Sequence, residues 1–286
     1  MNNPTNCKIP NTFLLGGQKC GSTWLASRLA QHPDVFMAEQ EIHFFDKDYN
    51  YEKGLAWYSR FFDRATSQSI VAEKTPEYLW ANGRGGKGVH SHSAEVHTRI
   101  KRHCPDAQFV VVLRDPVHRA VSAFNHARSN GYFCPAYSLE SVLFGQNKRI
   151  GSAFGILEKG IYADMLVPYF NLFERKQFLV LSFEDDVCGR PKEALRAVCE
   201  FLNVAPFEFT QLAEPENQVR ASLLGIWLRY LCPLLKRGAR CLDRFLPPCR
   251  THASPSLTAK LKEFYGPHND RLFALLGTRF GGWISA

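Results

Sequence analysis

The sequence has no long hydrophobic run, and its longest apolar stretches, such as residues 109–113, are far too short to cross a bilayer. Its first residues also lack the basic-then-apolar pattern of a secretory signal. No internal repeat and no low-complexity tract occurs, which argues against a repeat protein. We therefore expect a cytoplasmic protein without stable membrane insertion.

The sequence also has no clear pattern of disulfide-bonded cysteines or of paired metal ligands. The nine cysteines are an odd number, and without a secretory signal we expect free, mostly buried thiols. A cluster of histidines and one cysteine stands out, but its spacing fits no closed zinc pattern: His90, His92, His97, His103 and Cys104. The sequence thus predicts no metal site.

The composition is that of a globular protein that binds something negatively charged. A chain of 286 residues is long enough for one large α/β domain or two small ones. Hydrophobic residues make up 45% and charged residues 22%, close to the globular average. The formal net charge of +8 suits a nucleotide, a nucleic acid or a membrane surface. Charge alone does not choose among these ligands.

Short apolar runs alternate with helical patterns along the chain. The runs lack strict alternation, which is typical of strands covered on both faces, and they lie at residues 12–15, 69–72, 108–113 and 177–182. Helical spacing occurs at residues 22–31, 55–62, 95–103, 117–129, 161–173 and 191–202. This order predicts an α/β fold, with a central parallel sheet covered by helices in a single domain over residues 1–286. Residues 82–88, NGRGGKG, are interpreted as a surface loop.

Ligands of such sheets bind beyond the carboxyl ends of the strands, and a glycine-rich segment lies at one of them. Residues 16–24, GGQKCGSTW, follow the first strand and open the first helix, so backbone N–H groups and the helix dipole favour an anion there. Gly16 and Gly21 have the spacing of a Walker A loop, but Ser22 replaces its lysine. The lysine stands earlier, at Lys19. A tight connection without a ligand is the plain alternative.

A second candidate anion site follows the strand at residues 108–113. The strand runs into Arg114 and Asp115, and a helix begins near Pro116. Arg114 and Ser122 can face one phosphate, because the guanidinium fork suits bidentate phosphate contacts. The alternative is that Arg114 pairs with Asp115 or another carboxylate.

These two segments together resemble the sulfotransferases that use 3′-phosphoadenosine 5′-phosphosulfate (PAPS). Residues 19–25 look like their 5′-phosphosulfate loop, and Arg114, Asp115 and Pro116 with Arg119 and Ser122 look like their 3′-phosphate motif. Residues 32–34, 39–46 and 73–76 are similar to segments of the heparan-sulfate branch, and residues 262–277 to the closing helix. The resemblance is clear from residue 13 to about residue 185.

The resemblance implies a P-loop-NTPase-like sulfotransferase fold, with PAPS as sulfuryl donor and PAP as product. Arg250 lies where the resembling enzymes place a basic loop over the nucleotide, although Cys249 stands where they have glycine. The cofactor-binding residues are predicted to be Gln18, Lys19, Cys20, Gly21, Ser22, Thr23, Trp24, Arg114, Ser122 and Arg250.

Sulfuryl transfer needs a base for the acceptor proton and positive charge at the leaving phosphate. Glu41 and His43 stand two residues apart among phenylalanines, so an extended backbone points both to one side. The resemblance assigns the base to Glu41, whereas His43 either orients the acceptor, acts as base itself or is structural. Lys19 is the candidate at the leaving phosphate, and by resemblance Lys74 serves the acceptor side or the sulfuryl group. Asp46 either orients a neighbour or caps a helix, and the reaction requires no metal.

Residues 220–250 are apolar and basic. The plain interpretation is a helical cover over the active site with a solvated basic face, and the alternative is an amphipathic helix on a membrane or nucleic acid. The Cys232 to Cys241 spacing resembles a disulfide of the secreted heparan-sulfate branch, but in this setting we expect free thiols.

The predicted function is therefore a PAPS-dependent sulfotransferase that sulfates a hydroxyl or a nitrogen of a small-molecule acceptor, such as a secondary metabolite or a sugar. A P-loop kinase is the main rival, but a kinase should have lysine directly after Gly21, where this chain has Ser22. A scaffold protein without turnover is the second rival. We expect no nucleic-acid partner, and the sequence leaves a homo-oligomer open.

Overall fold

The structure is a computed structural model and describes residues 8–80, 95–212 and 220–283. The chain divides into two compact units, which are described separately. The first unit comprises residues 1–114, 162–216 and 278–283, and the second comprises residues 115–161, 217–277 and 284–286. The prediction of a single domain over residues 1–286 stays a prediction.

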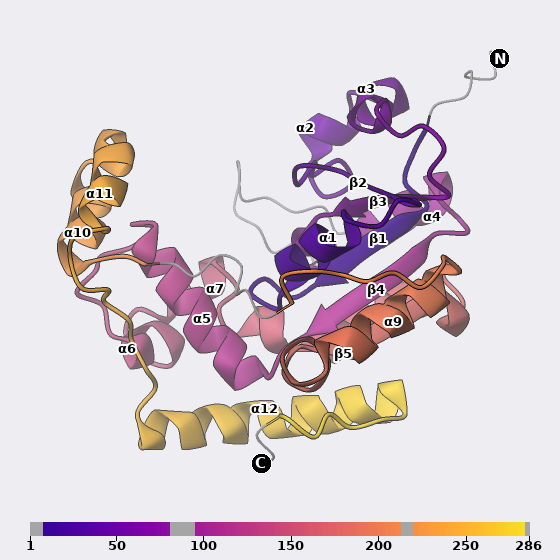
Figure 1. Cartoon of the computed structure of the whole chain (residues 1–286). Helices are drawn as coiled ribbons and strands as arrows, with labels where there is room; N and C mark the ends of the chain where they lie inside the picture. Colours follow the sequence, from indigo (N-terminus) through magenta and orange to yellow (C-terminus); the bar gives the residue numbers. More distant parts are fainter. Residues whose placement is uncertain (1–7, 81–94, 213–219, 284–286) are drawn as a thin grey trace. The chain divides into compact units, whose positions relative to one another are not determined.

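The first unit is built on a parallel sheet of five strands (Figure 1). The strands are β1 (Thr12–Gly16), β2 (Val35–Met37), β3 (Ile70–Lys74), β4 (Gln108–Leu113) and β5 (Phe178–Ser182), in the order β2-β3-β1-β4-β5. All four pairings are parallel. The central strands β1 and β4 are almost wholly buried, which explains their continuous apolar runs. The α/β class, with a central parallel sheet covered by helices, is confirmed.

One face of this sheet is aliphatic. Leu14 of β1 and Val110 of β4 lie on it, in one buried cluster with residues of α1 (Ser22–Leu29) and α9 (Pro191–Leu202). Both helices carry their apolar residues on one side, as amphipathic helices that cover a sheet do. Burial of these side chains is the main force that holds α1, and with it the glycine-rich segment, against the sheet.

The other face is aromatic. Phe13 of β1 stacks on Phe109 of β4 with ring centroids 5.8 Å apart, and Tyr169 of α8 (Tyr162–Phe170) meets Phe109 edge-on at 5.6 Å. Tyr78, in the short helix η2 (Pro76–Leu79), lies against Phe13. The remaining helices of this unit are α2 (Asp48–Tyr51), α3 (Leu55–Ser59), η1 (Arg60–Phe62), α4 (Val96–His103), η4 (Arg175–Gln177) and the π-helix η5 (Phe183–Gly189).

The described part of the second unit is helical except for one isolated bridge between Ser222 and Pro248. Phe124 of α5 packs in one core with Leu261 and Tyr265 of α12. Asp115 caps α5, since its carboxylate accepts hydrogen bonds from the first backbone N–H groups of that helix. The helices are α5 (Pro116–Ser129), α6 (Leu139–Leu143), α7 (Lys148–Ala153), η3 (Glu158–Gly160), α10 (Leu223–Leu231), η6 (Pro233–Leu235), α11 (Lys236–Leu242) and α12 (Pro255–Leu276).

The predicted strands and helices all occur, with ends shifted by a few residues. The helix expected at residues 55–62 is α3 followed by η1, and the one expected at 161–173 is the shorter α8. Strand β2 was not predicted, because three residues carry too little pattern. Residues 82–88, His90 and His92 lie outside the described residues. Among the described residues, none of the helices has the length and apolar character needed to cross a membrane.

Candidate active site

Three strands of the first unit deliver the predicted site residues to one edge of the sheet. Leu14 of β1 pairs with Lys74 of β3, and Gly16 pairs with Val112 of β4. Because the strands are parallel, the segment after β1, the end of β3 and Arg114 after β4 all leave the sheet at its carboxyl edge. This is the edge at which open α/β sheets bind their ligands.

The turn after β1, residues 17–21, has a backbone shape that favours glycine. Gly21 has φ +91°, and a Cβ atom there would lie 2.6 Å from the ring of Phe183. Lys19 also has a positive φ, of 76°, which is uncommon for a residue with a side chain. Gly21 directly precedes α1 and has no side chain to cap it. The first N–H groups of α1, which have no intrahelical partner, therefore lie at the turn, an arrangement that favours an anion.

Some predicted cofactor-binding residues in and after this turn point into the protein. The Trp24 side chain is buried in the aliphatic core, and its indole N–H donates to the carbonyl of Leu212 at 3.2 Å. The Cys20 thiol is buried, 3.5 Å from the hydroxyl of Tyr162. Ser22 is buried as well. Trp24 and Cys20 are thus placed to offer a ligand their backbone groups rather than their side chains, whereas Gln18 and Lys19 are half-buried.

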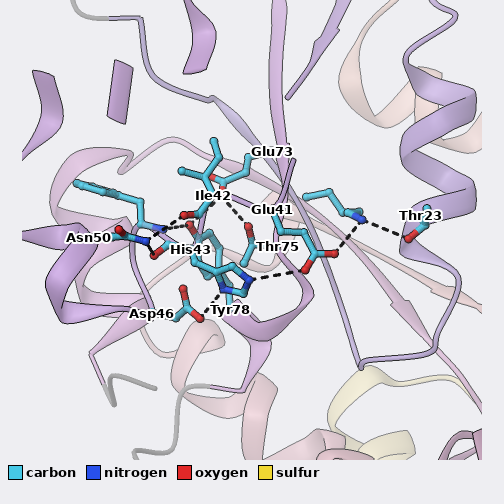
Figure 2. Close-up of polar contacts among 11 residues, drawn as sticks. Thr23, Glu41, Ile42, His43, Asp46, Asn50, Glu73, Thr75 and Tyr78 are labelled. Carbon is cyan, nitrogen blue, oxygen red and sulfur yellow. Dashed lines mark hydrogen bonds and ion pairs between the residues drawn. The ribbon is translucent and has the colours of Figure 1, made fainter. Parts of the chain in front are cut away.

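Lys74 connects the glycine-rich turn with the candidate base. Its Nζ atom lies 3.2 Å from Oγ1 of Thr23 and 2.9 Å from Oε1 of Glu41. Figure 2 marks both contacts with dashed lines that end at Glu41 and at Thr23. The Lys74 side chain is 15% exposed and that of Glu41 38%. The carboxylate is therefore open to an acceptor, while the cation beside it is largely covered.

His43 lies between two carboxylates (Figure 2). Its Nδ1 atom is 2.9 Å from Oδ2 of the buried Asp46, and its Nε2 atom is 3.7 Å from Oε2 of Glu41. Burial opposes protonation, but the hydrogen bond to Asp46 and the charges of Asp46 and Glu41 outweigh it, so the pKa of His43 is raised above 6.5. Asp46 thus orients the imidazole. The alternative was that Asp46 caps a helix, but the residue at the N-cap position of α2 is Lys47.

The segment that carries Glu41 and His43 is an irregular loop, and polar groups beneath it fix its shape. His43 has φ +55°. The hydroxyl of Tyr78 accepts the backbone N–H of Phe44 at 2.9 Å and that of Phe45 at 3.3 Å, and the Asn50 amide donates to the carbonyl of His43 at 3.1 Å. Phe44 and Phe45 are fully buried in the aromatic core. Although Glu41 stands among phenylalanines in the sequence, its carboxylate lies beside Lys74 and His43.

Glu73, one residue before Lys74, is a buried support of this loop that the sequence interpretation missed. The hydroxyls of Thr75 and Tyr78 donate to its Oε1 at 2.7 and 2.8 Å, and that of Tyr58 donates to its Oε2. Complete burial raises the pKa of Glu73 to about 7, although these hydrogen bonds act in the opposite direction. A carboxylate beside Lys74 at the end of a buried strand was the available signal.

Arg114 is tied to the glycine-rich turn. Its Nη1 donates to the carbonyl of Lys19 at 3.2 Å, and its guanidinium lies 4.7 Å above the ring of Phe183. Its Nε is 3.6 Å from Oε1 of Glu184, a counter-charge that the sequence interpretation did not single out. Burial and, after it, the charge of Arg114 lower the pKa of Lys19. Two cations at this edge suit a ligand with several negative charges.

Two predicted cofactor-binding residues lie in the second unit. Ser122 is half-buried on α5, and Arg250 is exposed in the segment between α11 and α12. Their predicted contacts with a nucleotide stay predictions. Cys232 and Cys241 are free thiols, as are the other cysteines among the described residues. His103, from the histidine cluster, lies 2.9 Å from the hydroxyl of Tyr51.

The candidate site thus combines a glycine-rich turn before a helix, cations on neighbouring strand ends and a carboxylate with an adjacent histidine, which suits transfer of an anionic group. Residues 10–218 match the family model described as the sulfotransferase domain, which is well over half of the chain. The chain belongs to the sulfotransferase family, whose members generally use PAPS and release PAP.

Heparan sulfate glucosamine 3-O-sulfotransferases are among its relatives. The chain is 29% identical over 282 residues to the 3B1 enzyme of Mus musculus, covering 96% of this chain and 65% of that one. It is 28% identical over 283 residues to heparan sulfate glucosamine 3-O-sulfotransferase 6 of Homo sapiens, covering 97% of this chain and 75% of that one. A sulfotransferase structure from Alicyclobacillus acidocaldarius, 24% identical, has a TM-score of 0.69 and shares the fold over 96% of this chain and 99% of that one.

Proposed function

We propose that this protein transfers the sulfuryl group of PAPS to a hydroxyl or a nitrogen of a small acceptor, with Glu41 as the general base. One observation carries the proposal: Lys74 Nζ lies within hydrogen-bond reach of both Thr23, at the anion-binding turn, and Glu41. The candidate base therefore lies one side chain away from the anion site. A proton acceptor at this distance from a bound sulfuryl group is what in-line transfer requires.

The residues at this edge fit a donor with several negative charges. The N–H groups at the start of α1 suit the 5′-phosphate, and Lys19 is half-buried beside them. Arg114 offers a guanidinium with five donors, of which the Lys19 carbonyl takes one from Nη1. We assign the 3′-phosphate to Arg114, because a fork-shaped cation at a strand end suits bidentate contact. Bound PAPS would supply the sulfuryl group.

Each charged residue has a role in the transfer step. Glu41 takes the proton of the acceptor O–H or N–H as the acceptor atom forms its bond to sulfur. Lys19 stabilises the negative charge on the phosphate oxygen as its bond to sulfur breaks. Lys74 neutralises the sulfuryl oxygens and keeps Glu41 in place. His43, held by Asp46, positions the acceptor through its Nε2 side.

For the acceptor, we propose a small molecule and rank a sugar hydroxyl first. The relatives are named as enzymes that sulfate the 3-O position of a glucosamine in heparan sulfate. The exposed carboxylate of Glu41 beside a cation suits a polar, hydroxyl-rich acceptor better than an apolar one. Glucosamine saccharides therefore lead the panel of acceptors, followed by amines and phenolic metabolites.

The donor is tested without knowledge of the acceptor. PAP, adenosine 5′-phosphate and ATP with Mg²⁺ are compared in a thermal-shift titration of the full chain. A nucleotide present at a hundred times its Kd stabilises the fold by about 2.7 kcal/mol. We expect such stabilisation from PAP at far lower concentration than from the other two. Equal shifts from all three would remove the PAPS assignment, and a shift from ATP with Mg²⁺ alone would favour a kinase.

A further inference from the structure

Residues 223–246 of the second unit, here called the hairpin surface, hold most of the exposed large apolar side chains that the structure describes. Leu234 is 93% exposed, Phe245 85% and Leu231 70%. Leu224 and Leu235 are about half exposed. Monomeric proteins rarely present so many large apolar side chains together unless the surface binds something.

Hydrogen bonds and an ion pair hold the backbone of the hairpin surface in place. Asp243, after α11, accepts hydrogen bonds from the N–H and the hydroxyl of Ser222 at 2.8 Å each and pairs with the guanidinium of Arg229. A Cβ atom on Gly225 would lie 2.2 Å from the Asp243 carboxylate, so glycine permits this close approach. Arg229 also donates to the carbonyl of Ser129 at 3.0 Å. Helices α10 and α11 therefore lie side by side (Figure 1).

The charges on the hairpin surface have one sign. Four exposed basic residues follow α10, namely Lys236, Arg237, Arg240 and Arg244. The single acidic residue of residues 220–250 is Asp243, whose side chain is buried in its pair with Arg229. The exposed leucines and Phe245 are thus interspersed with cations, and the one carboxylate of this segment is engaged by Arg229.

We propose that the hairpin surface docks the protein on the surface of an anionic lipid bilayer. Exposed leucine and phenylalanine side chains enter the boundary between headgroups and acyl chains, while lysines and arginines meet the anionic headgroups. The helices lie along the surface, because α10 has nine residues and α11 has seven, and spanning requires about 20. Charge complementarity therefore selects an anionic bilayer as the occupant.

Two other occupants fit these residues less well. A nucleic acid would account for the basic residues, because its phosphates bind lysine and arginine. It would not account for the aliphatic side chain of Leu234, which is 93% exposed. A second copy packed about a two-fold axis would place like charges against each other, because such an interface uses the same surface on both sides. An anionic bilayer satisfies the apolar and the basic groups together.

The test is sedimentation of the full chain with phosphatidylcholine vesicles, with and without phosphatidylserine. We expect clear partition only onto vesicles that contain phosphatidylserine, and weaker partition at high salt. The double substitution Leu234→Ser with Phe245→Ser should lower the partition coefficient at least roughly tenfold. Arg237→Gln with Arg240→Gln should lower it by about fivefold for each charge removed.

Matched control variants elsewhere on the protein distinguish binding through the hairpin surface from nonspecific adsorption to vesicles. Tyr49→Ser removes an aromatic ring that is 52% exposed, and Lys176→Gln with Arg196→Gln removes two exposed charges. Neither should change partition, and unchanged thermal midpoints of all variants confirm that they fold. No nucleotide or acceptor takes part, so failure here leaves the proposed function intact.

Three results would overturn the proposal. The first is equal partition with and without phosphatidylserine, or no partition at all. The second is partition that Leu234→Ser with Phe245→Ser leaves unchanged. The third is a dimer in analytical ultracentrifugation that these same substitutions disperse, which would make a second copy the occupant.

Discussion

The Nζ atom of Lys74 lies 2.9 Å from Oε1 of Glu41. This contact joins the end of β3 to the irregular loop before α2, so the carboxylate is held at the edge of the sheet where the anion-binding turn also lies. An ion pair that is partly open to water adds little to stability. Its importance is positional, because it fixes the proton acceptor next to the cation that the sulfuryl group would meet.

Glu41→Gln should abolish turnover and leave nucleotide binding intact. Glutamine has nearly the same size, and its carbonyl can still accept a hydrogen bond from Lys74, but it cannot take a proton. We expect the rate of sulfuryl transfer to fall about 10²–10⁴-fold, which is the usual contribution of a general base. The PAP affinity, measured by calorimetry, should not change.

Glu39→Gln is the matched control. This neighbouring carboxylate is 79% exposed and pairs with Arg64 on the surface, so its loss should not affect turnover. Full activity of Glu41→Gln would refute the assignment of the base. If His43→Gln lost activity instead, the imidazole would be the proton acceptor.

His43 should make stability depend on pH in a predictable direction. Its folded pKa is raised above 6.5 by Asp46 and Glu41, against the effect of burial. Protonation of His43 therefore stabilises the folded protein fully below pH 6.5, and this contribution is lost as pH rises through the raised pKa. Urea unfolding across this window should show wild type more stable than His43→Gln at low pH, with the difference shrinking as pH increases. The same difference at every pH would contradict the contact with Asp46.

Glu73 should change stability with pH in the same direction as His43 but for a different reason, because burial disfavours its charged form. Its ordinary pKa of 4.5 is raised to about 7 in the folded protein, so the folded state binds the extra proton between these values. Stability should therefore fall as pH rises from 4.5 through 7, by roughly 3 kcal/mol for complete burial. Glu73→Gln cannot ionise and should be more stable relative to wild type at pH 8 than at pH 5, as measured by urea unfolding. A difference that grows toward acid would disprove the raised pKa.

The fold and the turn before α1 were predictable from the sequence because local signals specify them. The apolar run before Gly16 and the helical spacing after Gly21 place a turn at the start of a helix whatever the rest of the chain does. Lys19, Glu41, Lys74 and Arg114 were found by motif, and the structure brings them to one edge of the sheet.

The polar support beneath the site was not predictable, because it depends on side chains that meet only in three dimensions. Tyr58, Glu73 and Tyr78 are spread over 21 residues of sequence. In the structure the two tyrosine hydroxyls meet at the buried carboxylate of Glu73. Glu184 reaches Arg114 from a π-helix, a rare element without a sequence signal. Likewise, the sequence places Glu41 among phenylalanines, but Phe44 and Phe45 are buried in the core and the carboxylate lies beside Lys74.

Arg114→Ala should remove the preference for the 3′-phosphorylated nucleotide. The guanidinium is held by the Lys19 carbonyl, stacked over Phe183 and left with further donors for a phosphate. We expect the PAP affinity to fall about 10–100-fold, the size of one or two charge-assisted hydrogen bonds, and the affinity for adenosine 5′-phosphate to change less. Arg114→Lys keeps the charge but not the fork and should give an intermediate PAP affinity. Calorimetric titration with both nucleotides measures the preference, and Arg190→Ala, which removes an exposed arginine paired with Asp186, is the control. An equal loss of affinity for both nucleotides would show that Arg114 only supports the turn through the Lys19 carbonyl, and the 3′-phosphate would then need another partner.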